Sequence, residues 1–439
     1  MEYSNNDYKK LGDRIRANPK NISDEDYEML QHLRLSYKSS MSLIFNSIEQ
    51  IAHKIDSHCV CTYRIKRIES IISKLLRFPE MQVNRAEDIA GCRCILSNEE
   101  QVYKLFNYII KNPQKLPFEI KGKINDYIQT PQKSGYKSIH LNVSLKGENK
   151  RIEIQIRSVE HHNWATLVEI SDLLFNLRIK EIGEASNPQL FRLHLLLSKS
   201  QNEITYKDIN YIADTVIKFQ YIQKLGEIFA KNYIEVRNHW NSLKLHNNHF
   251  FLISTGQDGV PEISGFKDFD TAETCYFERF INNKSNKNIV LTHLQRTNFA
   301  KISVAYSNYF LTFNNTITKI LCYLSIAVEE SFKKNRIIVF KRYYQAFLDI
   351  MLFWMNTQII EIKSFNKDVN IRKSKLKYGE WASSISYGVQ LFNNMFRSTQ
   401  SKLKLSFFNP ITYVIMRKKH KKFQANVNTI IAKENSQLN

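Results

Sequence analysis

Two neighbouring stretches of the chain alternate strictly between apolar and polar residues. In 138–145 the odd positions are apolar and the even positions are polar, whereas in 151–157 the isoleucines take the even positions. Alternation with period two predicts a strand that has one face in the core and the other in solvent or a cleft. The short loop between the stretches contains Gly147 and fits a hairpin. We therefore expect four polar side chains to share one face: His140, Glu153, Gln155 and Arg157.

Other strand and helix patterns surround this hairpin. Apolar residues recur at helical spacing between residues 27 and 55, after Ser23, whose hydroxyl can cap a helix with acids in its first turn. Ser97 and Glu100 have the spacing of a capping box. Strands and helices mixed in this way predict an α/β or α+β domain. The expected strands are 59–66, 89–96 and a region within 118–129, and the expected helices are 67–77, 98–111 and 159–177.

The pattern changes after residue 177. Polar stretches there have the composition of connectors, 250–265 is rich in glycine, and 311–356 is expected to be mostly helical. A chain of 439 residues is longer than one ordinary domain. We expect four parts: an N-terminal helical segment 1–57, a mixed domain 58–180, a helical connector 181–245, and a basic, mostly helical C-terminal domain 246–439.

Positive charge is concentrated toward the end of the chain. The net charge is +21, and residues 331–439 hold 20 Lys and Arg against 5 Asp and Glu, which leaves +6 for the first 330 residues. This bias favours an anionic partner, such as nucleic acid, a ribosome or a membrane surface. A well-solvated lysine-rich surface would give the same composition. The hydrophobic content of 43% excludes a wholly disordered chain.

The compartment follows from the N-terminus and the cysteines. Residues 1–20 are polar and lack the apolar segment of a secretory signal, so we expect a cytoplasmic location with reduced thiols. The longest apolar stretch, 343–360, is interrupted by polar residues and predicts a buried helix, with no membrane contact. Two Cys-x-Cys pairs, 59/61 and 92/94, could suggest zinc, but strand alternation explains each pair as core without a metal.

A basic corner is expected where the strand 59–66 passes into the next helix. Arg64 and Lys66 are two residues apart and share a strand face, and Ser70 and Lys74 are four apart and share a helix face. Three cations and a hydroxyl suit a polyphosphate, which needs positive charge and donors from several directions. An ordinary basic surface helix would show the same spacing.

Two carboxylates from different strands, Asp88 and Glu153, are the candidate ligands of a single Mg²⁺, which keeps waters and substrate phosphates in its coordination sphere. Glu153 could also accept a proton from an attacking hydroxyl. The competing interpretation is a salt bridge from Glu153 to Arg93 or Arg157. Tyr136 follows a glycine in the loop before the first strand of the hairpin, where its ring could meet a nucleotide base or belong to the core.

Four blocks of residues, taken together, resemble the RelA/SpoT nucleotide pyrophosphokinase domain. Their order and spacing agree over about residues 59–174, and the second half of the chain is not covered. The last two blocks in combination are the most specific part of the resemblance. The blocks are Arg64-Ile-Lys66 with Ser70 and Lys74, Asp88-Ile with Arg93, Ser134-Gly-Tyr136-Lys-Ser-Ile-His140, and Glu153-Ile-Gln155-Ile-Arg157.

The resemblance implies an α+β fold in which a mixed sheet of about five strands is flanked by helices. It implies transfer of the β,γ-pyrophosphate of ATP to a ribose 3′-hydroxyl, with release of AMP. Asp88 and Glu153 would hold Mg²⁺, and Glu153 would help to activate the hydroxyl. The ATP phosphates would be bound by Arg64, Lys66, Ser70, Lys74 and Arg93.

The same resemblance assigns residues to the acceptor. Tyr136 would stack on the acceptor base, and His140, Gln155 and Arg157 would position the acceptor and its phosphates. Family members often have a lysine four residues before this tyrosine, whereas this chain has Gln132 there and Lys133 next. We therefore include Lys133 among the acceptor-binding residues.

Two activities and one non-enzymatic role are compatible with the resemblance. The first is a synthetase of the small alarmone type, without the hydrolase domain of the long members, that makes (p)ppGpp from ATP and GDP or GTP. The second is a toxic member that modifies the 3′ end of tRNA or adenosine nucleotides, with the C-terminal region as a neutralising or phage-sensing domain. The basic C-terminal third favours tRNA. A degenerate fold that only binds nucleic acid is disfavoured because Asp88, Glu153, Tyr136 and Arg64 are all present.

Overall fold

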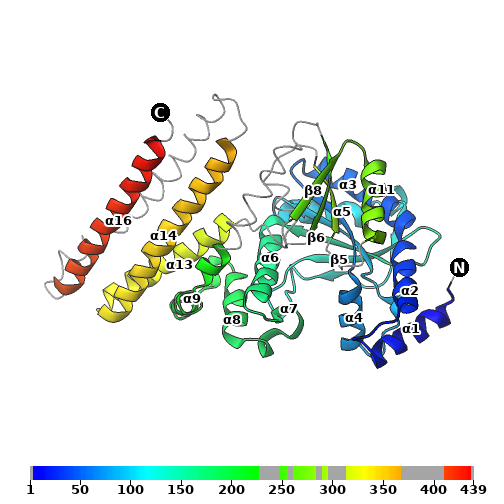
Figure 1. Ribbon diagram of the computed structural model, residues 1–439, viewed down its shortest axis with the longest axis horizontal. Helices are drawn as coiled ribbons and strands as arrows, with labels where there is room; N and C mark the ends of the chain where they lie inside the picture. The colour runs from blue at the N-terminus through cyan, green and yellow to red at the C-terminus, as the bar shows by residue number, and fades with distance from the viewer. Residues whose placement is uncertain are drawn as a thin grey trace. The chain divides into compact units, whose positions relative to one another are not determined.

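The computed structural model describes residues 3–226, 248–255, 261–282, 289–294, 313–366 and 410–436. The chain divides into two compact units (Figure 1). The sheet unit comprises Met1–Leu167 and Asn238–Tyr309, and the helical unit comprises Val168–Arg237 and Phe310–Asn439. The candidate site residues of the sequence analysis all belong to the sheet unit.

In the described residues the sheet has nine strands, in the order β3-β5-β6-β2-β1-β9-β7-β8, and β4 also pairs with β5. β2 and β6 are parallel, and the other pairs along the sheet are antiparallel. The strands of the first segment are β1 (Val60–Ile65), β2 (Ala90–Leu96), β3 (Phe118–Ile120), β4 (Asn125–Asp126), β5 (Ile139–Leu145) and β6 (Ile152–Ser158). The mixed α+β fold of the sequence analysis is confirmed.

The sheet is larger than expected because a later segment joins it. Residues 250–293 form β7 (Phe250–Thr255), β8 (Pro261–Phe266), α11 (Phe269–Asn282) and β9 (Ile289–His293), and β9 pairs with β1. The sequence pattern predicts a mostly helical domain from residue 246, whereas this segment contributes three strands and one helix to the sheet unit. Phe251, Leu252 and Ile253 are all buried. A short apolar run buried on both faces has no period that separates a strand from a helix, so the sequence pattern could not identify these strands.

The described N-terminal part of the sheet unit contains five α-helices. Their bounds are α1 (Asn5–Ala17), α2 (Asp24–Leu35), α3 (Lys38–Ile55), α4 (Ile68–Arg77) and α5 (Glu99–Lys111). Of these helices, α3 contacts β1, β2 and β5 of the sheet directly, α5 contacts β2 and β6, and α1 contacts α2 and α4. Ile139, Leu141 and Val143 of β5 and the isoleucines of β6 are buried, as the alternation predicted; at the end of β5 the pattern changes, since Ser144 is buried and Leu145 is partly exposed.

Two helix starts test the capping predictions. Ser23 caps α2 as expected, and its side chain accepts a hydrogen bond from the backbone of Asp26. The capping box at Ser97 is wrong: Asn98 caps α5. The Ser97 hydroxyl and backbone N–H both donate to Asp56 Oδ2 at 2.7 Å, so this side chain is already engaged by a distant carboxylate.

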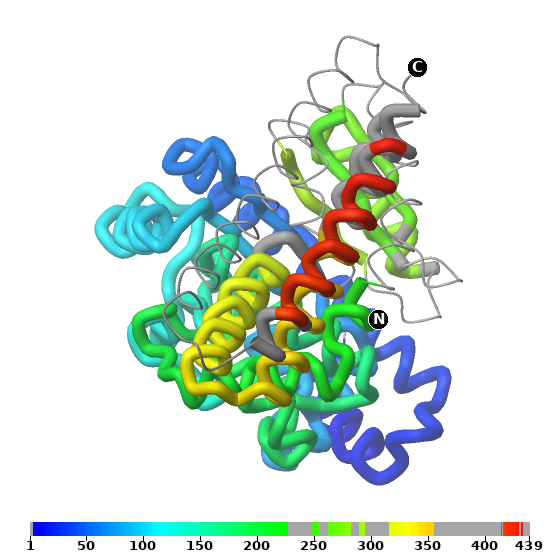
Figure 2. The backbone as a smooth tube through the Cα atoms, turned by 90° about the vertical axis from the view of Figure 1, so that its left-hand side faces the viewer, coloured from blue at the N-terminus to red at the C-terminus, as the bar shows by residue number. Residues whose placement is uncertain are grey.

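The described residues of the helical unit form helices. Some of these helices pack on their neighbours in sequence, and others pack on helices that are distant in sequence. Helix α6 (Val159–Leu174) leads into this unit, followed by α7 (Ile179–Ile182), α8 (Pro188–Leu197), α9 (Tyr206–Lys218), α13 (Phe313–Lys333), α14 (Ile337–Asn366) and α16 (Pro410–Ser436). α13 packs on α9 and α14, and α14 packs on α16, which lie side by side in both views (Figure 1 and Figure 2). No helix among the described residues has the length and apolar character needed to cross a membrane.

Candidate active site

The strand registers place the polar side chains in two rows across one face of the sheet. In the first row Arg93 of β2 lies beside Gln155 of β6, which lies beside His140 of β5. In the second row Arg64 of β1 lies beside Gly91, which lies beside Glu153. Partners that are directly opposite in a ladder point to the same side of a sheet. The prediction that His140, Glu153 and Gln155 share a face is therefore confirmed.

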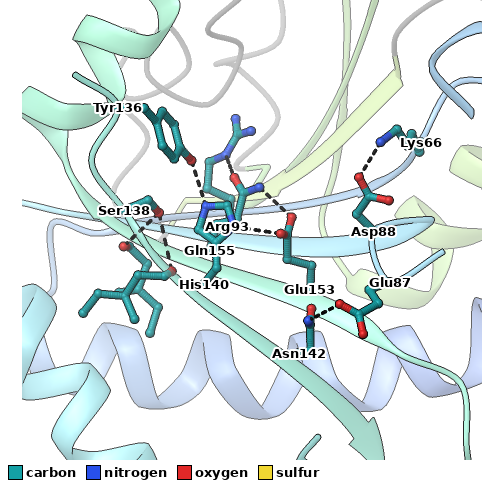
Figure 3. Close-up of polar contacts among 12 residues, drawn as sticks. Lys66, Glu87, Asp88, Arg93, Tyr136, Ser138, His140, Asn142, Glu153 and Gln155 are labelled. Atoms are coloured by element: carbon teal, nitrogen blue, oxygen red, sulfur yellow. Dashed lines mark hydrogen bonds and ion pairs between the residues drawn. The ribbon is translucent and has the colours of Figure 1, made fainter. Parts of the chain in front are cut away.

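A continuous chain of hydrogen bonds crosses this face from Arg93 to Tyr136 (Figure 3). Arg93 Nε donates to Gln155 Oε1 at 3.2 Å, and Gln155 Nε2 donates to Glu153 Oε2 at 2.7 Å. Glu153 Oε1 lies 2.8 Å from His140 Nδ1, and His140 Nε2 lies 3.0 Å from the Tyr136 hydroxyl. Each oxygen of the Glu153 carboxylate is thus held by one protein donor, so the orientation of the carboxylate is fixed.

The charges and hydrogen bonds of these linked residues keep Glu153 ionised. Burial opposes its charge, but hydrogen bonds from His140 and Gln155 outweigh burial and hold the pKa of Glu153 below its ordinary value. Burial also opposes the charge of His140, yet Tyr136 and Glu153 raise the pKa of His140 to about 9. For Tyr136, the charges of His140 and Arg157 outweigh burial and lower its pKa. The result is a carboxylate paired with an imidazolium at neutral pH.

The second carboxylate, Asp88, precedes β2 and is held by two lysines. Lys66 donates to Asp88 Oδ2, and Lys74 Nζ lies 2.6 Å from Asp88 Oδ1. Burial raises the pKa of Asp88, but the two ammonium groups outweigh it and lower the pKa below the ordinary value. The negative charge of Asp88 in turn raises the pKa of Glu153, which shows that the two carboxylates act on one another.

The remaining residues of the basic corner lie where the sequence pattern placed them. Arg64 is partly exposed on β1 and forms no ion pair within the described part of the chain. Ser70 and Lys74 are both partly exposed on one face of α4, four residues apart. Lys66 follows β1 directly and its backbone N–H donates to Ile89 at 2.7 Å, which fixes the corner against the start of β2.

The loop before β5 carries the aromatic side of the site. Gly135 adopts a positive φ of 91°, which favours glycine, and its N–H donates to Gln132 at 2.8 Å in a tight turn. The turn presents Tyr136 to His140, with ring centroids 5.7 Å apart in an edge-on arrangement. Tyr136 is only partly buried, so it is not a core residue. Lys133 is exposed in the same loop.

Arg157 differs from the other polar residues of β6. Its side chain is buried, and Nη2 lies 2.5 Å from Nδ1 of His162 at the start of α6. The expected alternation of β6 ends here, where the strand passes directly into α6. Neither alternative partner of Glu153, Arg93 or Arg157, forms an ion pair with it; His140 does. The role of Arg157 in acceptor binding stays a prediction.

Sequence reasoning missed three residues of this face. Gly91 lies between Arg64 and Glu153, and a Cβ there would sit 3.1 Å from the Glu153 carbonyl oxygen. A glycine inside a strand was the signal that could have identified it. Glu87 pairs with Arg151 and accepts a hydrogen bond from Asn142 at 2.7 Å. Tyr127 packs edge-on against His140 at 5.3 Å, and no sequence pattern marks it.

The donor set on this face fits Mg²⁺. Asp88 and Glu153 supply ionised carboxylate oxygens, the ligands that this ion prefers, and each oxygen keeps a lone pair beyond its present hydrogen bond. The two negative charges repel one another, since the charge of Asp88 raises the pKa of Glu153. A divalent cation between the two carboxylates would relieve this repulsion. Gly91 leaves room beside Glu153 because it has no side chain.

Comparisons with known proteins address the same part of the chain. The family model described as the region found in RelA / SpoT proteins matches residues 63–173. The chain is 34% identical over 151 residues to the GTP pyrophosphokinase YwaC of Bacillus subtilis, which covers 30% of this chain and 70% of that protein. It is 33% identical over 143 residues to RSH3, a probable chloroplastic GTP diphosphokinase of Arabidopsis thaliana. This match covers 32% of this chain and only 19% of that protein.

Two solved structures of small alarmone synthetases are similar to part of this chain. The small alarmone synthetase 2 of Bacillus subtilis matches 40% of this chain and 91% of its own, with 27% identity and a TM-score of 0.31. The small alarmone synthetase 1 of the same organism, bound to its product pppGpp, matches 40% of this chain and 92% of its own, with 22% identity and a TM-score of 0.32. On the family model and the extent of the match to the Bacillus subtilis pyrophosphokinase, this chain belongs to the RelA/SpoT family.

Proposed function

We propose that this chain is a pyrophosphokinase that transfers the β,γ-pyrophosphate of ATP to the 3′-hydroxyl of GDP or GTP and releases AMP. The observation that carries the proposal is the hydrogen-bonded chain from Arg93 through Gln155, Glu153 and His140 to Tyr136, with Asp88 and its lysines beside it. Cations and ionised carboxylates on one rigid face are the parts that phosphoryl-type transfer requires, and the aromatic ring beside them suits stacking on a nucleotide base.

The reaction needs positioning and charge more than covalent chemistry by the protein. Glu153 and Asp88 would hold Mg²⁺, which supplies positive charge at the transferring phosphates. Glu153 accepts the proton of the attacking 3′-hydroxyl as the O–P bond forms and the bond between the α- and β-phosphates breaks. Its low pKa makes Glu153 a weak base, which is sufficient because the transition state of such transfers is loose.

The ATP side uses the basic corner. Without substrate, Lys66 and Lys74 are both paired with Asp88. Polyphosphate oxygens carry more negative charge than one carboxylate, so these lysines move toward ATP when it binds and leave Asp88 to the metal. Arg64 and Arg93 flank Gly91 and Gln155 on the same face and add charge along the path of the phosphates.

The acceptor side uses the end of the hydrogen-bonded series at which Tyr136 lies. Tyr136 is held by His140 and by Tyr127, which fixes its ring for stacking on a base. Lys133, exposed in the same loop, is placed to meet an acceptor phosphate. A guanine nucleotide is supported by the relatives, whose names are GTP pyrophosphokinase and GTP diphosphokinase.

The test is an acceptor panel. The purified chain is incubated with Mg²⁺ and ATP labelled at the γ-phosphate, with GDP, GTP, AMP or deacylated tRNA in separate tubes. We expect label on GDP and GTP. The matched control is Glu119→Gln, an exposed carboxylate on β3 of the same sheet that pairs only with Lys121 in the described residues and should transfer normally. Absence of label from every acceptor would contradict the proposal.

A second candidate acceptor, tRNA, is favoured by one observation on α16. Arg417, Lys418, Lys421 and Lys422 are exposed on this helix, so the basic tail forms a cationic surface in the helical unit. Phosphate contacts of this kind dominate the affinity for nucleic acids. Label on tRNA that disappears when these four residues are changed to Gln, and no label on GDP or GTP, would select this alternative.

A further inference from the structure

A cluster of cysteines and a histidine is buried behind the candidate active site. Cys59 and Cys61 lie at the start of β1, Cys94 lies opposite Cys61 on β2, and His53 comes from the last turn of α3. The side chains of Cys94 and Arg93 are neighbours in a regular strand and therefore point to opposite faces. The cluster thus occupies the face that does not carry Glu153 and His140.

The sulfur atoms are at metal-ligand spacing. Cys59 Sγ lies 4.0 Å from Cys61 Sγ, and Cys61 Sγ lies 3.8 Å from Cys94 Sγ. Two thiolates bonded to one tetrahedral Zn²⁺ at about 2.3 Å are about 3.8 Å apart. The donor atoms of His53, Cys59 and Cys61 all lie within 4.8 Å of one another, whereas Cys94 Sγ is close to Cys61 and lies outside this group of three. All three cysteines are fully buried and form no disulfide.

His53 is oriented as a metal-binding histidine is. Its Nδ1 lies 2.8 Å from Glu49 Oε1, one helical turn earlier, so Glu49 favours the tautomer with the proton on Nδ1. The lone pair of Nε2 then faces the cysteines. The His53 side chain is only 2% exposed, and its buried Nε2 makes no hydrogen bond of ordinary geometry among the described residues; it meets only the sulfur of Cys59, a poor hydrogen-bond acceptor. A metal ion would satisfy this nitrogen better than the sulfur does.

We propose that this cluster binds one Zn²⁺ through Cys59, Cys61 and His53, with Glu49 holding the His53 ring; Cys94, next to Cys61, becomes the fourth ligand when its side chain moves toward the other three. Three cysteines and one histidine form a common closed, structural zinc site. On binding, the three thiols lose their protons to solvent and the sulfurs become thiolates. Thiolate and imidazole ligands select zinc over Mg²⁺, so this site and the candidate active site would take different ions.

Strand alternation alone does not account for the cluster. It explains why Cys59 and Cys61 are buried together, but not why a histidine on another element brings its ring nitrogen next to them. The site would link α3, β1 and β2. Glu49 also accepts a hydrogen bond from His293 of β9, so the same carboxylate extends this link to the strand that joins 250–293 to the sheet.

The test is a metal analysis of the full chain purified under reducing conditions. We expect about one zinc per chain by mass spectrometry. Cobalt(II), exchanged for zinc, should show sulfur-to-cobalt charge-transfer bands and the intense visible bands of a tetrahedral site. Metal-free reduced protein that takes up neither zinc nor cobalt, or a cobalt spectrum without sulfur bands, would overturn the proposal. This spectrum is measured on the unmodified protein and so does not depend on a variant that folds.

Variants locate the ion. Cys59→Ser and Cys61→Ser should lose the metal, and Glu49→Gln should weaken its binding by about 10- to 100-fold because the His53 ring is no longer held. Cys92→Ser is the matched control, a buried cysteine on the same face of β2 outside the cluster, and should retain it. His293→Ala should also retain it. Zinc that persists in Cys59→Ser and Cys61→Ser, or that is lost in His293→Ala alone, would overturn the assignment.

Discussion

The two faces of strand β2 hold their polar groups in different ways. On the face of Arg93, the series of hydrogen bonds from Arg93 to Tyr136 links side chains that solvent still reaches. The side chain of Glu153 is 20% exposed and that of His140 is 17% exposed. On the face of Cys94, the cysteines are fully buried and Nε2 of His53 makes no hydrogen bond of ordinary geometry among the described residues. The first arrangement can exchange its partners for substrates, whereas the second suits a ligand that stays in place.

The largest effect is expected from neutralising a carboxylate on the Arg93 face. Glu153→Gln and Asp88→Asn should each lower pyrophosphate transfer by at least about 1,000-fold, because Glu153→Gln removes a metal ligand and the proton acceptor and Asp88→Asn removes the other charged metal ligand. The fold should persist, since both side chains are nearly isosteric with the originals. Initial rates and thermal unfolding measured together check this. Near-normal turnover in either variant would remove that carboxylate from the metal site.

A steric change at Gly91 tests whether the space beside Glu153 is used. Gly91→Val should lower transfer by about 100-fold, because a side chain there presses on the Glu153 backbone at 3.1 Å and fills the gap next to Arg64. Gly91→Ala should show a smaller loss in the same direction. Steady-state kinetics with ATP and GDP give the comparison. Unchanged kinetics in Gly91→Val would show that neither substrate nor metal occupies this gap.

The imidazolium of His140 should shape the pH dependence. Its pKa is raised to about 9, so the pair with Glu153 is fully present below about 6.5, the ordinary histidine value, and is lost as the pH rises through about 9. Both transfer activity and the free energy of unfolding should therefore fall over this window. His140→Asn should flatten the fall in unfolding free energy, whereas the control His58→Asn, at an exposed position, should keep it. An unchanged profile in His140→Asn would assign the pH dependence to another group.

The smallest effect concerns the attachment of the later segment to the Cys94 face. The backbone N–H of Ile65 donates to the Tyr276 hydroxyl of α11 at 2.9 Å. Tyr276→Phe leaves this buried donor without a partner and should lower the free energy of unfolding by about 1–3 kcal/mol. Chemical denaturation measures the difference. Tyr206→Phe, at an exposed tyrosine of α9, is the control and should leave stability unchanged.

The sequence predicted local patterns of the site well and its distant partners poorly. Alternation in β5 and β6 placed His140, Glu153 and Gln155 on one face, because period two fixes which way a side chain points. It could not show that Glu153 pairs with His140 instead of Arg157, since that depends on the register between strands and on the start of α6. Residues 250–293 were missed as sheet because their pairing with β1 spans more than two hundred residues of sequence. The hydrogen bond from Ser97 to Asp56 was missed for the same reason, because the two residues are distant in sequence and no local pattern indicates the contact.

The central claim is that the Arg93 face transfers pyrophosphate as a unit, and the stoichiometry of products tests it most directly. ATP labelled at the γ-phosphate is incubated with GDP and Mg²⁺, and the nucleotides released and labelled are separated and counted. The account predicts AMP and labelled guanine nucleotide in equal amounts, with little ADP. ADP as the matching product would show transfer of a single phosphate, and ATP left intact would show no transfer; either result would contradict the account.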